Sequence, residues 1–281
     1  MLFKLFAKLP LPLLYTLSGP IYFVTYHLVR YRRGIVREHL STAFPTSSEK
    51  EICRLEKRYY RNLADVTVEV VKGMAISEAE FEARVTHKNY DLVKGFIDQG
   101  KSLLLLSSHS GNWEWLQLAM GLQLPILVES IYKPLHSKTM DRVFYEMRTR
   151  FGASLVNAVD LMGEVIKNRK KQRAYAILAD QKPRGSGRCH HTDFLNRDTR
   201  FFVGPEKIAQ FAKLPIIYVR MTRVKRGYYE IEYQLLAEPP YEKNKDSYPV
   251  TELYARAVES HILQYPDSWL WSNRRWRVRN P

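Results

Sequence analysis

Apolar residues in the first third of the chain recur every three or four positions. One series, which predicts an amphipathic helix of about six turns, runs through Ile52, Leu55, Tyr59, Leu63, Val66 and Val70. A capping box at Thr46–Glu49 would open this helix. A shorter helix is predicted from Tyr90 to Gln99, with Gly100 as the residue that ends it.

From residue 103 onward the pattern changes to short apolar runs that alternate with helical stretches. The runs that predict buried strands are Leu103–Ser107, Pro125–Ile131, Ala174–Leu178 and Pro215–Met221. A helix is predicted over residues 140–147, closed by Gly152, and another over 250–265. The period-two segment Tyr228–Leu236 predicts an antiparallel strand, with an edge position left open. The alternation indicates a mixed α/β sheet covered by helices on both faces.

The segment Leu9–Val29 carries no charged residue and is long enough to match a bilayer core of ~30 Å as a helix. Because three prolines interrupt it, a kinked or interfacial anchor competes with a spanning helix, and a helix buried in a soluble core is a third interpretation. The arginines that follow favour a cytoplasmic location for the rest of the chain. We therefore divide the chain into an anchor at residues 1–37 and one domain at 38–281.

The chain of 281 residues has a formal net charge of +15, which indicates an anionic partner. Nucleic acid, an anionic lipid surface and an acidic carrier protein all fit. Only two cysteines are present, so no disulfide framework is expected and a reducing compartment is favoured. No metal is expected, because Cys189-His190-His191 has no second ligand cluster at a suitable spacing.

The stretch 103–115, LLLLSSHSGNWEW, places His109 at the end of a predicted strand and Glu114 five residues later. On one continuous helix these side chains would point about 140° apart. They can meet only if His109 lies on the loop and Glu114 in the first turns of a following helix. Gly111 and Asn112 suit that junction, since glycine permits unusual backbone angles and asparagine is a favoured cap.

Such a pair suits acyl transfer. His109 would take the proton from an attacking hydroxyl, Glu114 would fix its tautomer, and the free amides of the helix start would stabilise an oxyanion. A structural histidine beside a solvated glutamate fits the bare spacing equally well.

Several blocks together resemble the lysophospholipid acyltransferase superfamily, in the variant of the lipid A late acyltransferases. The string SSHSGNWEW is similar to their His-x4-Asp/Glu motif. Further similar blocks, in the family's order, are Tyr132-Lys133-Pro134, Asp180-Gln181-Lys182-Pro183, Phe201–Pro205 with a helix over 206–211, and the WSNRRWR segment from Trp271 to Arg277. One departure is Lys133, which stands where arginine is usual.

The resemblance implies an α/β sandwich of the lysophospholipid-acyltransferase type and an enzyme at the cytoplasmic face of a bacterial inner membrane. It would move a fatty acyl chain from acyl carrier protein, or from acyl-CoA, to a hydroxyl of a lipid A precursor or related glycolipid. No cofactor is implied beyond that co-substrate. His109 and Glu114 take the catalytic roles. The residues expected to contact substrate are Asn112, Lys133, Asp180, Gln181, Arg274 and Arg275.

Two alternatives stay open. The acceptor could be a lysophospholipid or another glycolipid. The chain could instead be a non-catalytic membrane or nucleic-acid binder, although no known nucleic-acid module is present. The C-terminal tryptophans and arginines suit lipid headgroups and the interfacial zone, whereas core packing explains the tryptophans equally well.

Overall fold

The computed structural model describes residues 2–183, 187–241 and 247–276. Its helices are α1 Leu2–Ala7, α2 Leu11–Phe23, the π-helical turn η1 Val24–Leu28, α3 Arg33–Ala43, α4 Glu49–Gly73, α5 Glu78–Glu82, α6 Asp91–Asp98, α7 Trp113–Gln123, α8 Lys138–Arg148, α9 Leu161–Lys167, α10 Gly204–Ala212 and α11 Pro249–Gln264. Its strands are β1 Val85–His87, β2 Leu103–Ser107, β3 Leu127–Tyr132, β4 Ser154–Asn157, β5 Arg173–Leu178, β6 Cys189–Asp193, β7 Asp198–Phe202, β8 Ile216–Lys225 and β9 Tyr228–Ala237.

A seven-stranded mixed sheet in the order β1-β9-β8-β2-β5-β3-β4 forms the centre of the molecule. All neighbouring pairs are parallel except β8 and β9. The predicted mixed α/β sheet is therefore confirmed. The antiparallel strand over 228–236 is also confirmed, although β1 and not β9 lies at the edge.

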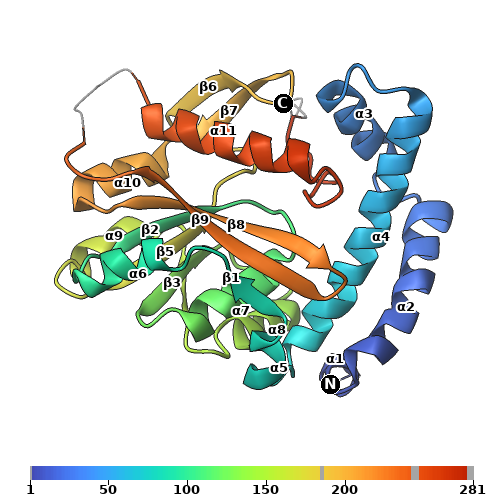
Figure 1. Cartoon of the computed structure of the whole chain (residues 1–281), viewed down its shortest axis with the longest axis horizontal. Helices are drawn as coiled ribbons and strands as arrows, with labels where there is room; N and C mark the ends of the chain where they lie inside the picture. Colours follow the sequence, from blue (N-terminus) through green and yellow to red (C-terminus); the bar gives the residue numbers. More distant parts are fainter. Residues whose placement is uncertain (1, 184–186, 242–246, 277–281) are drawn as a thin grey trace.

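Helices cover both faces of the sheet, because the alternating residues of its strands are apolar on both sides. Leu103 and Leu105 of β2 join the cluster formed with α6 and α7, whereas Leu104 and Leu106 join the cluster formed with α9, α10 and α11. In Figure 1, α7 and α8 lie on one side of the sheet and α11 on the other, with the separate β6–β7 hairpin beside α11.

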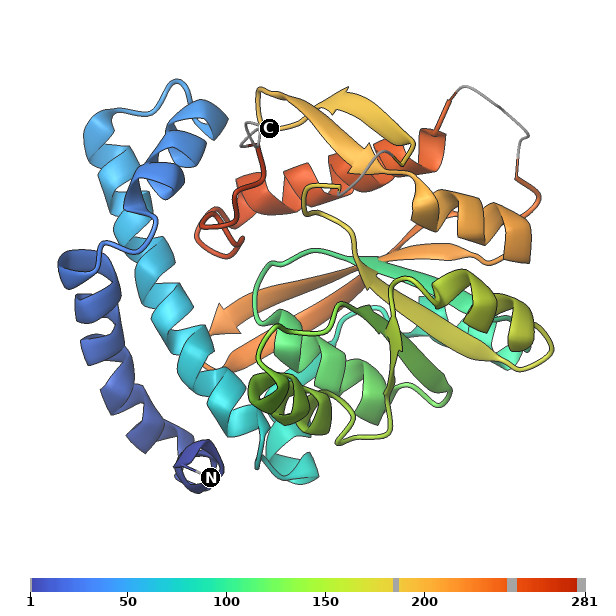
Figure 2. The ribbon, with the colours of Figure 1, turned by 180° about the vertical axis from the view of Figure 1, so that it is seen from behind.

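Helix α4 forms where a helix was predicted, but the predicted capping box at Thr46–Glu49 is wrong. The capping box is made by Ser48 and Glu51, two residues later than the expected one, because the Ser48 side chain accepts from the Glu51 amide and Glu51 accepts from the Ser48 amide. Figures 1 and 2 show α4 along one side of the molecule with α2 packed against its outer surface.

The uncharged N-terminal segment folds as α2 followed by η1. In the part of the chain that the structure describes, no helix is both long and apolar enough to cross a bilayer. Leu11 and Leu14 of α2 are buried, while Leu13, Leu17 and Phe23 are 40–53% exposed. The division at residue 37 stays a prediction, and this position falls inside α3.

Candidate active site

Three neighbouring parallel strands deliver the site residues. Strands β2, β5 and β3 lie side by side, so their carboxyl ends meet at the same edge of the sheet. His109 follows β2, Asp180 and Gln181 follow β5, and Lys133 follows β3. The sheet thus gathers residues that are 71 positions apart in the chain, as in the bonded pair His109 and Asp180.

Strand register places His109 opposite Asp180. Ser107 of β2 pairs with Leu178 of β5, and each of the two site residues comes two positions after its strand partner. The Asp180 carboxylate accepts from the His109 backbone amide at 3.1 Å, and its other oxygen lies 2.7 Å from His109 Nδ1. The imidazole is thus held both through its own ring and through the backbone that carries it.

Asp180 is almost completely buried and has a third partner, the Trp269 indole, which donates at 2.8 Å. Burial alone would raise the pKa of the carboxyl. The charge of His109 and the hydrogen bonds from His109 and Trp269 outweigh burial, so the pKa lies below its usual value. Asp180 is therefore an anionic partner for the histidine.

The junction predicted between His109 and the following helix is confirmed. Helix α7 starts at Trp113, and the Asn112 side chain caps it by accepting from the Trp115 amide at 3.0 Å. Gly111 has φ +63°, and a Cβ there would lie 2.6 Å from the Met221 carbonyl oxygen, so only glycine fits.

The expected contact between His109 and Glu114 needs a correction, because the carboxylate that binds His109 is Asp180. Glu114 instead accepts two hydrogen bonds from the Arg148 guanidinium, at 2.6 and 2.7 Å. Both side chains are largely shielded, with 7% and 21% exposed. Burial would lower the pKa of Arg148, but the Glu114 carboxylate more than compensates and raises it. This fork geometry fixes the guanidinium firmly.

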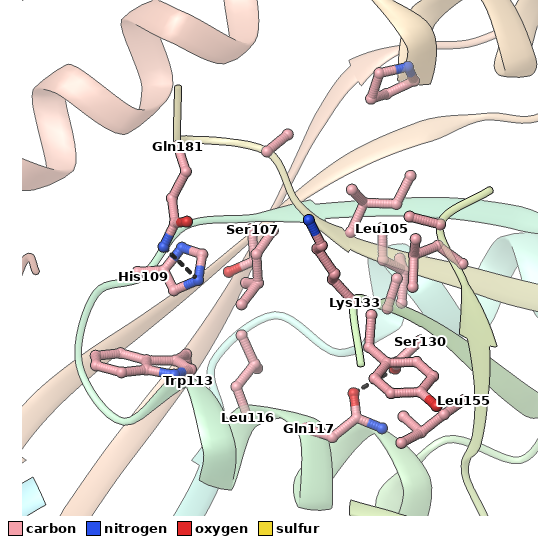
Figure 3. A pocket seen from close by; sticks show the side chains of 18 of the residues that line it. Leu105, Ser107, His109, Trp113, Leu116, Gln117, Ser130, Lys133, Leu155 and Gln181 are labelled. Atoms are coloured by element: carbon pink, nitrogen blue, oxygen red, sulfur yellow. Dashed lines mark hydrogen bonds between the residues drawn. The ribbon is translucent and has the colours of Figure 1, made fainter. Parts of the chain in front are cut away.

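His109, Glu114, Arg148, Lys133 and Gln181 all line one cavity of about 570 Å³, a size typical of ligand sites. Figure 3 shows His109, with Gln181 bonded to its ring, on one side of this cavity and Ser130 and Gln117 on the other. Most of the remaining lining is apolar, including Leu105, Leu116, Met120, Ile131, Leu155 and Ile177. The cavity is thus an apolar chamber with a histidine at one side.

Four residues expected to contact substrate do not line the cavity. Asp180 is buried and binds His109 instead. Asn112 is fully buried and donates to Glu69, so its amide is committed to holding the loop. Arg275 is also buried, donates to the Arg200 carbonyl and stacks on Phe201; burial lowers its pKa to about 10. Arg274 is exposed and does not line the cavity.

The segment Ser268–Trp271, which leads into the C-terminal block, packs behind the His109 loop. Trp269 and Trp271 are buried, which agrees with core packing and not with an interfacial role. The segment around Trp269 binds the His109 loop, since Gly111 N donates to Ser268 O at 3.1 Å and Leu270 N donates to His109 O at 3.0 Å. Arg277, the last residue of the block, lies outside the described residues.

Two further residues of the site, Arg148 and Gln117, could not be identified from local sequence patterns. Arg148 is the last residue of α8, where a basic side chain ordinarily complements the helix end. Gln117 is one polar residue on a buried part of α7. Only the fold shows that both line the cavity.

Comparison with known proteins gives concordant results. The family model described as bacterial lipid A biosynthesis acyltransferase matches residues 1–278. The chain is 24% identical to the lipid A biosynthesis palmitoleoyltransferase of Escherichia coli strain K12 over 98% of its own length and 88% of the relative's. It is 24% identical, with the same coverage, to a lipid A biosynthesis acyltransferase of Shigella flexneri. For the lipid A biosynthesis lauroyltransferase of Escherichia coli strain K12 the identity is 22%, over 98% and 89%.

Proposed function

The chain belongs to the bacterial lipid A biosynthesis acyltransferase family, and on that premise we propose that it transfers a fatty acyl chain from a thioester to a hydroxyl of a lipid A precursor or related glycolipid. The donor is acyl carrier protein, or acyl-CoA. The observation that carries the proposal is His109, which is bonded to Asp180 and faces an apolar cavity. Because the chain belongs to a family of acyltransferases, the alternative of a non-catalytic membrane or nucleic-acid binder is the wrong class.

His109 acts as the general base. With a proton on Nδ1 directed at Asp180, Nε2 carries a lone pair, and Gln181 Nε2 donates to it at 3.0 Å. The acceptor hydroxyl takes the place of this amide and gives its proton to Nε2 while its oxygen bonds to the thioester carbonyl carbon. When the carbon–sulfur bond breaks, the imidazolium returns the proton to the leaving thiolate. Asp180 stabilises the imidazolium between these steps.

Glu114 acts through Arg148. The two-point ion pair orients a permanent positive charge in the cavity wall, where it can stabilise the oxyanion that develops on the thioester carbonyl. Lys133, exposed at the same cavity, adds a point charge for a phosphate of the acceptor or of the donor's pantetheine arm. The net charge of +15 favours encounters with both acidic carrier protein and phosphorylated lipid.

The outer side of α2 and η1 contacts the cytoplasmic face of the inner membrane. The apolar side chains that it exposes are Leu13, Leu17, Phe23, Val24 and Leu28, each at least 40% accessible. Such a row suits a helix that lies in the interfacial zone. Arg30 and Arg32, which follow directly, can contact anionic headgroups.

Purified protein, incubated with acyl carrier protein thioesters and a tetra-acylated lipid A precursor, tests the transfer. We expect mass spectrometry to detect the added acyl chain, and His109→Ala to lower the rate by at least ~10³-fold. His136→Ala, which alters an exposed histidine outside the cavity, is the matched control and should retain the rate. Normal turnover by His109→Ala would sink the mechanism. If a parallel reaction shows transfer only to lysophospholipids, the acceptor is a lysophospholipid and not a lipid A precursor.

Membrane contact is tested with anionic phospholipid vesicles. Leu13→Glu with Phe23→Glu should weaken sedimentation with the vesicles at least tenfold, because two charges would enter the apolar zone. Leu253→Glu, on α11, changes an equally exposed leucine and should have no effect. Equal binding to the vesicles by the wild type, the double variant and Leu253→Glu would exclude α2 as the contact surface.

A further inference from the structure

Gln117 and Ser130 form a polar pair in the apolar part of the cavity. Gln117 comes from α7 and Ser130 from β3, and each is only 7% exposed. The cavity wall beside the pair includes the apolar residues Leu105, Leu116, Met120 and Ala176, and Glu114 lies one helical turn before Gln117. Figure 3 shows the pair across the cavity from His109 and Gln181. A simple hydrocarbon chain needs no polar group in such a wall.

The pair leaves one hydrogen-bonding group unused. The Ser130 hydroxyl donates to Gln117 Oε1, whereas Gln117 Nε2 has no partner among the residues that the structure describes. If the amide is turned over, Nε2 donates to Ser130 and the carbonyl oxygen becomes the free group. In either orientation one end of the amide has no partner among the described residues, and it belongs to a side chain that lines the cavity.

The structure assigns to this amide the recognition of a hydroxyl group on the acyl chain. A hydroxyl both donates and accepts, so it satisfies the free end of Gln117 in either orientation. An unsubstituted chain at the same place would cover the amide with methylene groups and leave it unpaired, which is unfavourable. The preferred donor is therefore a hydroxylated fatty acyl thioester. This inference rests on the proposed acyl transfer.

The position of Gln117 places the hydroxyl near the reacting end of the chain. Trp113, the first residue of α7, has its ring 5.6 Å from that of His109. Gln117 lies four residues further along α7, a rise of about 6 Å. A substituent on one of the first few carbons beyond the thioester carbonyl would reach it, whereas one near the far end of a long chain would not.

The test uses acyl carrier protein thioesters of one chain length, either unsubstituted or with one hydroxyl at successive carbons. For the wild-type enzyme we expect kcat/KM to be about tenfold or more higher for one of the proximally hydroxylated donors than for the unsubstituted donor. Gln117→Leu, which keeps the side-chain size and removes the amide, should reduce this ratio to about one or invert it. Gln123→Leu makes the same replacement on the same helix but outside the cavity, and it should leave the ratio unchanged.

The outcomes separate the two proposals. If the wild-type enzyme transfers no acyl group from any donor, the proposed function fails. If it transfers acyl groups but prefers the unsubstituted chain, or if Gln117→Leu retains the preference for a hydroxylated donor, the role of Gln117 is wrong and the proposed function stands. If the wild-type enzyme transfers all donors equally well, the amide binds only water and the role of Gln117 is likewise wrong.

Discussion

The two sides of the His109 loop differ in polarity and in hydrogen bonding. Behind the loop, polar groups are buried and bonded to one another: Asp180 binds His109 and Trp269, Tyr254 donates to the Ser107 carbonyl at 2.7 Å, and Asn112 donates to Glu69. In front of the loop lies the cavity, which is mainly apolar and has charged groups at few places.

The difference separates two tasks. A general base must be held within a fraction of an ångström, and dense hydrogen bonding achieves this. An acyl chain is flexible and gives few directional contacts, so an apolar wall can accept it without a fixed pose. Changes behind the loop should therefore impair every substrate equally, whereas changes in front should distinguish among them.

The largest expected effect is that of Asp180→Asn. The variant keeps the shape of the side chain but removes the charge that holds the tautomer and stabilises the imidazolium, so kcat/KM should fall ~10³ to 10⁴-fold for all donors. Steady-state kinetics with two acyl donors would measure this, with a thermal melt to confirm the fold. A loss below tenfold, or a loss confined to one donor, would contradict the role of Asp180.

Glu69 offers the next largest effect. Its buried carboxylate accepts from Tyr15 at 2.6 Å, from Tyr229 at 2.5 Å and from Asn112 at 3.0 Å, and so connects α2, the sheet and the His109 loop. Glu69→Gln replaces an acceptor oxygen by a donor and should lower the free energy of unfolding by about 3 kcal/mol, measured by urea denaturation. The control Glu82→Gln alters an exposed glutamate of α5 and should change little. Equal stability of the two variants would show that this network is dispensable.

The sequence predicted the parts of the site that depend on near neighbours. Strand β2, the loop with Gly111 and the Asn112 cap were all predicted, because strand length, backbone freedom and capping are local properties. Asp180 was expected to contact substrate, not to bind His109. Its contact with His109 depends on which strand lies beside β2, and the spacing within one motif carries no information about strand order.

The same limit explains the C-terminal block. A stretch rich in tryptophan and arginine has the composition of a membrane interface, and composition cannot tell a surface ring from a buried one. Trp269 is buried because the chain after α11 returns to the His109 loop, as the bridge between Ser110 and Trp269 shows. Its indole then binds Asp180, a contact that only the tertiary fold creates.

A double-mutant cycle at Glu114 and Arg148 decides how the front of the site works. If Glu114 acts through Arg148, Glu114→Gln and Arg148→Met should each lower kcat/KM ~10 to 100-fold, and the double variant should lose little more than Arg148→Met alone. If Glu114 instead acts directly on His109, as its spacing suggests, Glu114→Gln should lower kcat/KM as much as Asp180→Asn does. The losses from Glu114→Gln and Arg148→Met should then multiply in the double variant. Kinetics of the four proteins in the cycle separate these results.

The smallest expected effect is a pH dependence of stability from His261, which lies behind the loop and is buried. Its Nδ1 is 3.2 Å from the Tyr218 hydroxyl, and this hydroxyl is 3.4 Å from the Ser108 hydroxyl. Burial, aided by Arg220, lowers its pKa from 6.5 to about 3.

As the pH falls below 6.5, the His261 side chain binds a proton in the unfolded chain but not in the folded chain. The native state should lose about 2 kcal/mol from this residue by about pH 5. His261→Gln, which cannot titrate, should show a flatter stability profile between about pH 7 and pH 5 by urea denaturation. An unchanged slope would mean that His261 is protonated in the native protein and that the buried side of the loop tolerates a charge.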